Sequence, residues 1–115
     1  MPRRIRLPGD FVVDFGRQVL WLERNAGMLW LERLEADVLR AAELLSDYPG
    51  AGALVLRDGR ILLRRLVLPS TPYVVWYIYE EAQSAGEIWL ARLLHSRQRR
   101  PKPEPSRWFP ADEAK

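Results

Sequence analysis

The chain contains no cysteine and a single histidine, His95, among its 115 residues. The absence of cysteine excludes disulfide bonds, thiolate nucleophiles and cysteine-ligated metals, and it is typical of proteins of the reducing cytoplasm. With so few nitrogen and sulfur ligands in the sequence, we expect no transition-metal site and no other cofactor. The composition therefore predicts a cytoplasmic protein whose function does not depend on cysteine or on a bound metal.

Long apolar runs are also missing. No segment reaches the roughly 20 apolar residues that a membrane-spanning helix needs, and the N-terminus lacks the apolar core of a signal peptide. The sequence has no glycine-rich phosphate-binding loop, no paired-carboxylate motif and no serine-centred nucleophile motif. These absences argue against a membrane partner, a P-loop nucleotide hydrolase and a serine hydrolase.

Acidic residues are scarce in the second half of the chain. Residues 51–102 hold nine Lys or Arg and four acidic residues, whereas residues 1–50 hold seven Arg and eight acidic residues. Such a concentration of positive charge is expected where a surface meets phosphate or an acidic protein. It is equally expected where arginines keep a very apolar sheet soluble, so charge alone leaves both interpretations open.

Two segments before residue 50 have the spacing of amphipathic helices. In the first, Phe11, Phe15 and Leu22 recur at helical intervals behind Asp10, a candidate N-cap. In the second, residues 31–45 carry one apolar stripe and one charged face. Because only an Asn-Ala-Gly break separates them, we expect the two helices to pack antiparallel as a hairpin.

After residue 52 the hydrophobic period changes to that of strands. Strands are predicted at residues 53–57, 60–68, 73–79 and 87–95, with an Asp-Gly hairpin turn between the first two and a short edge strand at residues 3–7. The fold class is therefore α+β, an antiparallel helical hairpin packed on a curved antiparallel sheet over residues 1–100.

The C-terminal segment, residues 101–115, is rich in proline and is predicted to be a flexible tail. Trp108 and Phe109 are its only large apolar residues. They either fold back onto the domain or bind a partner, and the sequence leaves both open.

Arginines interrupt two strands that are otherwise apolar. Because adjacent strand residues point to opposite faces, Arg64 and Arg65 must diverge, one towards the helices or the rim and one towards the open face of the sheet. A buried arginine needs a partner. Each is therefore either paired with a helix carboxylate or available to hold phosphate.

The last predicted strand carries Arg92 and ends at His95. Strict alternation places Leu90, Arg92 and Leu94 on one face, and Trp89, Ala91, Leu93 and His95 on the other. His95 is a candidate general acid or base, because histidine titrates near neutrality. It is equally a candidate structural residue bonded to the backbone.

The strand at residues 73–79 places Tyr73, Tyr77 and Tyr79 on one face. Aromatic residues beside arginines can stack nucleobases, as in many RNA-binding proteins. They can equally fill a core and its border.

Three stretches, LLSDYPGAG, RRLVLPSTPYVVWYIYEE and EIWLARLLHSRQRRP, resemble the RelE/ParE family of toxins from bacterial type II toxin–antitoxin systems. The matching positions are Leu45, Pro49 and Gly52, then Arg64 and Leu66, Tyr73 through Tyr77, and Arg92 through His95. The resemblance covers about residues 5–100. It implies the α+β fold described above, inhibition of growth, and a cognate antitoxin that binds and neutralises the chain in a hetero-oligomer.

The family has two branches, and the resemblance favours the ParE-like one, whose members poison DNA gyrase and are not nucleases. The RelE-like alternative is a ribosome-dependent mRNA endonuclease. Ser96 follows His95 where some ribosome-cutting relatives have tyrosine, and the sheet region contains no lysine. A third interpretation is an inactive protein with the toxin fold that retains only binding.

The resemblance also implies site residues. For an mRNA endonuclease, His95 would act as acid or base, with Arg92 and Arg64 holding phosphate. The residues expected to bind the target or the antitoxin are Arg64, Arg65, Tyr77, Arg92, Arg97, Arg99 and Arg100.

Overall fold

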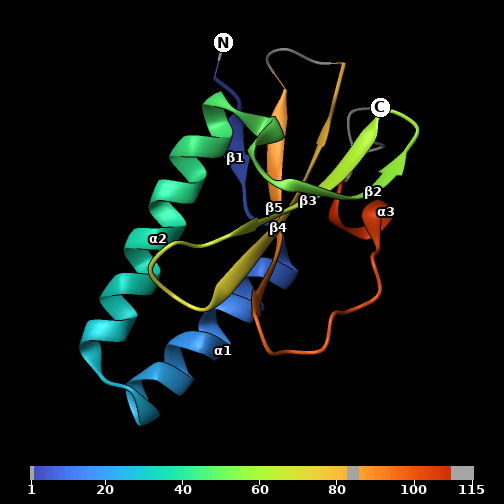
Figure 1. The fold of residues 1–115 in the computed structure, drawn as a ribbon. Helices are drawn as coiled ribbons and strands as arrows, with labels where there is room; N and C mark the ends of the chain where they lie inside the picture. Colours follow the sequence, from blue (N-terminus) through green and yellow to red (C-terminus); the bar gives the residue numbers. More distant parts are fainter. Residues whose placement is uncertain (1, 83–85, 110–115) are drawn as a thin grey trace.

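The computed structural model describes residues 2–82 and 86–109 (Figure 1). Its elements, in chain order, are β1 (Arg4–Arg6), α1 (Gly9–Asn25), α2 (Met28–Asp47), the 3-10 turn η1 (Pro49–Ala51), β2 (Ala53–Asp58), β3 (Ile61–Val67), β4 (Tyr73–Glu80), β5 (Glu87–His95) and α3 (Pro105–Trp108). Both helices and all five strands expected from the sequence are present.

The strands form one sheet in the order β1-β5-β4-β3-β2. Strands β2 to β5 pair antiparallel, as predicted, whereas β1 pairs parallel to β5. The α+β fold class is thus confirmed, but the sheet is mixed. A parallel pair needs a long connection, and the helical hairpin together with three strands lies between β1 and β5 in the chain.

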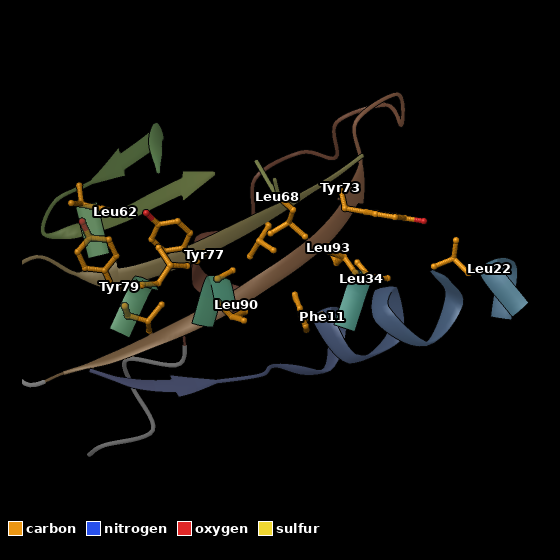
Figure 2. Packing of buried hydrophobic residues seen from close by; sticks show 14 residues of the cluster. Phe11, Leu22, Leu34, Leu62, Leu68, Tyr73, Tyr77, Tyr79, Leu90 and Leu93 are labelled. Carbon is orange, nitrogen blue, oxygen red and sulfur yellow. The ribbon is translucent and has the colours of Figure 1, made fainter. Parts of the chain in front are cut away.

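The helical hairpin covers one face of the sheet (Figure 1). The chain reverses between the two helices at Gly27, whose φ is +89°. Figure 2 shows the core between the two layers. Leu34 of α2 and Tyr77 and Leu90 of the sheet have practically no exposed surface there. Burying a large apolar side chain contributes roughly 1.5–3 kcal/mol, so this layer makes a large contribution to stability.

Asp10 does not cap α1. The helix begins at Gly9 behind Pro8, and no side chain caps its first turn. The Asp10 carboxylate instead accepts hydrogen bonds from the Trp108 indole Nε1 at 2.9 Å and from Arg107 Nη2 at 2.8 Å. The predicted N-cap was therefore wrong, because a partner far along the chain engages the carboxylate.

The C-terminal segment folds back over the second face of the sheet, opposite the helical hairpin (Figure 1). Trp108 has no exposed surface, and its ring meets that of Trp76 edge-on at 6.0 Å between centroids. Phe109 packs against the same cluster. Of the two fates that the sequence left open, these residues thus fold back. A flexible tail does not describe residues 105–109, and residues 110–115 lie outside the described part of the chain.

Acidification is expected to weaken the docking of α3. The pKa of Asp10 lies below its ordinary value of 3.8, chiefly because Trp108 donates to the carboxylate, and Arg107 and Arg92 also favour the charged form. A carboxyl whose folded pKa is lowered contributes stability above its ordinary pKa and loses that contribution as the pH falls through the lowered value. The difference in melting temperature between wild type and Asp10→Asn should therefore shrink from about pH 6 to about pH 2. A melting-temperature difference that stays constant over this pH range would show that the charge of Asp10 does not stabilise the docking of α3.

Candidate functional site

His95 ends β5 beside the first residue of β4, and its position is set by local contacts. The His95 ring meets the Tyr73 ring edge-on at 5.3 Å, and the two residues are paired across the sheet. His95 Nδ1 accepts a hydrogen bond from the Arg97 backbone N–H at 3.1 Å, which helps to fix the orientation of the ring. The histidine is half-buried and borders two hollows.

The first hollow, which we call the rim hollow, has a volume of about 140 Å³. Its polar lining comes from the ends of β3 and β5 and the segment that follows: Arg65, His95, Ser96, Gln98 and Arg100. Its apolar lining consists of Val67, Val74, Trp76 and Leu94. The rim hollow therefore combines an apolar floor with a basic border.

The second hollow, which we call the aromatic hollow, has a volume of about 370 Å³ and lies between α1 and the sheet end. Its lining residues are Arg17, Gln18, Trp21, Tyr73 and His95. The Tyr73 hydroxyl donates to Gln18 Oε1 at 2.9 Å, which fixes one wall. Trp21 is 54% exposed, so a large aromatic surface remains open to solvent here.

Four arginines near the rim hollow have no carboxylate partner among the described residues. Arg65 belongs to β3, and Arg97, Arg99 and Arg100 follow β5; we call these four the rim arginines. Four other arginines, Arg6, Arg57, Arg92 and Arg107, form ion pairs between 2.6 and 2.9 Å. Unpaired like charges gathered at one end of a sheet favour an anionic partner.

Arg64 and Arg65 diverge as the strand geometry predicted. Arg64 points to the helix-covered face, where its Nε donates to the Tyr79 hydroxyl at 3.1 Å and its Nη1 to the Gly52 carbonyl at 2.9 Å. Arg65 borders the rim hollow on the open face. Arg64 is therefore engaged inside the domain, and only Arg65 of the pair is positioned to meet a partner.

Tyr77 is entirely buried and holds the turn between α2 and β2. Its hydroxyl donates to the Pro49 carbonyl at 2.6 Å and accepts from the Gly52 N–H at 2.8 Å. Burial raises the pKa of this hydroxyl to about 12, so it remains a donor at any physiological pH. The structure thus gives Tyr77 an internal role and leaves it no exposed surface for a target.

Arg92 forms a bidentate ion pair with Asp14 of α1, with distances of 2.6 Å from Nε and 3.0 Å from Nη2. The Asp14 carboxylate also accepts the Leu93 N–H at 3.0 Å. Of the alternatives open for Arg92, the structure thus shows the pairing with a helix carboxylate.

The predicted alternation along β5 fails after Leu90. The register of β4 and β5 shifts between Trp76 and Tyr77, so that Trp76 pairs with Arg92 while Tyr77 pairs with Leu90. A β-bulge of this kind puts an extra residue on one strand and reverses the alternation beyond it. As a result Leu90 and Leu93 belong to the same helix-side core, while Ala91 and Leu94 belong to the open-face cluster.

The three residues that the family resemblance implies for RNA cleavage therefore have different surroundings. Arg64 and Arg92 are held by internal partners, and only His95 borders a hollow. Neither hollow beside His95 is lined by a carboxylate. Within the described residues, no group of three acidic or histidine side chains could hold a metal ion, and no helix could cross a membrane.

Sequence reasoning missed the α1 residues of the aromatic hollow, namely Arg17, Gln18 and Trp21. A signal was present, since Trp21 lies off the apolar stripe that contains Phe11 and Leu22. A large aromatic residue outside the buried stripe of a helix is a candidate surface contact.

Replacing Gly52 with alanine should destabilise the fold strongly. A Cβ there would overlap the Arg65 carbonyl oxygen and stand 2.8 Å from the Tyr77 hydroxyl, whereas one at Gly50 meets nothing within 4 Å. We expect Gly52→Ala to lose about 3 kcal/mol or more of unfolding free energy, since backbone cannot yield easily. Gly50→Ala is the matched control, with a change within about 0.5 kcal/mol by urea denaturation. Equal losses of unfolding free energy in Gly52→Ala and Gly50→Ala would contradict the close contacts described around Gly52.

Replacing Arg92 with alanine should cost about 3–5 kcal/mol of unfolding free energy, because it leaves the Asp14 carboxylate buried without its cation. Asp14 is only 5% exposed, which makes the loss large. The control is Arg97→Ala, whose side chain is exposed and unpaired in the described structure, with a change within about 0.5 kcal/mol. If both variants unfold at the same urea concentration as wild type, Arg92 does not have the structural role assigned to it.

The sequence matches no protein-family model and no curated protein. Among solved structures, the chain is similar to one described as "Chromosomal ParDE TA system from P. aeruginosa". The TM-score is 0.59 and the sequence identity 13%, over 81% of this chain and 95% of that chain. The match confirms the α+β fold that the resemblance to the RelE/ParE family implied.

Proposed function

We propose that the chain is the toxin component of a type II toxin–antitoxin module, that it inhibits growth by binding and poisoning DNA gyrase, and that a cognate antitoxin neutralises it. The observation that carries the proposal is a cluster of four arginines without an ion-pair partner among the described residues, Arg65, Arg97, Arg99 and Arg100, at one end of a sheet with this fold. The solved structure with the similar fold is described as a ParDE toxin–antitoxin system, which supports the toxin assignment.

The internal engagement of two arginines supports a binding toxin over a nuclease. An RNA-cleaving site needs cations free to stabilise charge that develops on phosphate. Arg92 is held by Asp14 and Arg64 by Tyr79 and Gly52. Removing either arginine from its partner would leave buried polar groups unsatisfied, which is costly.

The mRNA endonuclease stays as a second candidate because of one specific arrangement. His95 lies between a basic hollow and an aromatic hollow, so a phosphate and a nucleobase could flank it. In that reading His95 would serve as acid or base, and Arg65 and Arg100 would take the place of Arg64 and Arg92 at the phosphate.

The proposal is tested by inducing wild type and His95→Ala in a bacterium that has no matching antitoxin. Growth, a DNA-damage reporter and incorporation of a labelled amino acid are followed together. We expect growth arrest with damage signalling before translation falls, and the same arrest with His95→Ala, because histidine has no catalytic part in a gyrase-binding toxin.

Prompt loss of translation without damage signalling, abolished by His95→Ala, would instead establish the mRNA endonuclease. Normal growth with soluble, folded wild type would favour an inactive protein that retains only the toxin fold. Circular dichroism of purified His95→Ala is the folding control, since the histidine packs against Tyr73.

A further inference from the structure

The segment that carries most of the rim arginines is a loop held at both ends, not a free tail. At its start, the Ser96 N–H donates to the Pro72 carbonyl at 2.8 Å and the Gln98 N–H to the His95 carbonyl at 2.9 Å. At its end, Trp108 is buried and bonded to Asp10. We call residues 96–104 the basic loop.

The charge of the basic loop is strongly one-sided. It contains Arg97, Arg99, Arg100 and Lys102, with Glu104 as its only acidic residue. None of its four cations has an ion-pair partner in the part of the chain that the structure describes. Within this loop, Arg100 lines the rim hollow opposite Arg65 of β3. The loop therefore forms one wall of the hollow.

The lining of the rim hollow suits an acidic peptide better than a nucleic acid. Its floor includes Val67, which is 63% exposed, together with Val74 and Leu94. A phosphate backbone gains nothing from such an apolar floor, whereas a peptide with alternating acidic and apolar side chains satisfies both parts. Nucleobases need an exposed aromatic face, but Trp76 in this hollow is 3% exposed, and His95 is half-buried with its ring edge-on against Tyr73.

We propose that the rim hollow binds an acidic, partly apolar segment of a protein partner, and that Trp108, locked by Asp10, is a positioning residue that holds the basic loop in place for it. A wall fixed in advance reduces the conformational entropy that binding must remove. The inference deepens the proposed function and rests on it in naming the partner: in a toxin–antitoxin module, that segment belongs to the antitoxin.

The binding half is tested with the purified full chain and a fluorescein-labelled peptide of alternating glutamate and leucine, by fluorescence anisotropy. Arg65→Gln and Arg100→Gln should each weaken binding about tenfold, and added salt should weaken wild-type binding further. Arg60→Gln is the matched control, since Arg60 is exposed and precedes the opposite end of β3. It should change the dissociation constant by less than about twofold.

The positioning half is tested with Trp108→Ala, which keeps every arginine. It should weaken peptide binding about fivefold or more, while Trp108→Phe, which retains an apolar plug, should recover most of the affinity. Because the salt dependence reports the number of charge contacts, it should stay close to wild type in Trp108→Phe and fall in Trp108→Ala. If Trp108→Ala does not fold, Asp10→Asn, which removes the charged lock alone, takes its place.

Four results would overturn the inference or part of it. Unchanged binding in Arg65→Gln and Arg100→Gln would remove the site, and unchanged binding in folded Trp108→Ala or Asp10→Asn would remove the positioning role. A single-stranded RNA of equal charge that binds tighter than the peptide would assign the hollow to nucleic acid. Growth arrest on induction without peptide binding would refute this inference alone. Peptide binding without growth arrest would refute the toxin assignment and, with it, the naming of the partner as an antitoxin, but not the peptide site.

Discussion

The buried carboxylate of Asp14 is the contact on which the arrangement of helix and sheet depends. It holds Arg92 through two hydrogen bonds and accepts the Leu93 N–H, which follows the β-bulge in β5. Strand β1 pairs with β5 only as far as Trp89, so the Leu93 N–H lies beyond that pairing and needs another partner. By satisfying that group from α1, Asp14 ties the first helix to β5 at the point where the strand reverses its faces. One turn earlier on the same helix, Asp10 ties down the C-terminal segment.

Internal contacts also explain why a motif can mark a fold without marking a reactive site. The Pro49 and Gly52 carbonyls and the Gly52 N–H are all bonded by side chains of the sheet, namely Tyr77 and Arg64. A fixed tyrosine and arginine are therefore required for the turn that brings the chain from α2 into β2. The same residue types would serve equally well to hold phosphate if they were exposed. The burial of a side chain and the number of its hydrogen-bond partners decide whether it holds the turn or can hold phosphate. Neither property can be predicted from the residue type.

The arginines at the rim of the sheet, unlike Arg64 and Arg92, are not engaged by internal partners among the described residues. They are exposed or half-buried and have no ion-pair partner among the described residues, and Arg65 and Arg100 line a hollow with an apolar floor. Such a surface contributes little to the stability of the isolated chain, since like charges repel. It is suited to a partner that supplies acidic groups, and the buried Trp108 keeps its wall in one position. The fold thus uses one set of arginines to hold itself together and leaves another set available.

The sequence by itself determined the two helices, the four antiparallel strands and the opposite directions of Arg64 and Arg65, because these follow from periods of 3.6 and 2 residues. It also placed positive charge in the second half of the chain. Only the tertiary structure decided the parallel pairing of β1, the bulge in β5, the pairing of Arg92 with Asp14 and the docking of Trp108 on Asp10. Each of these joins residues that are far apart in sequence, and local periodicity carries no information about which distant partner satisfies a buried charge or a backbone group. For the same reason the sequence named seven candidate binding residues, and only the fold separated the rim arginines from the three residues engaged inside the domain.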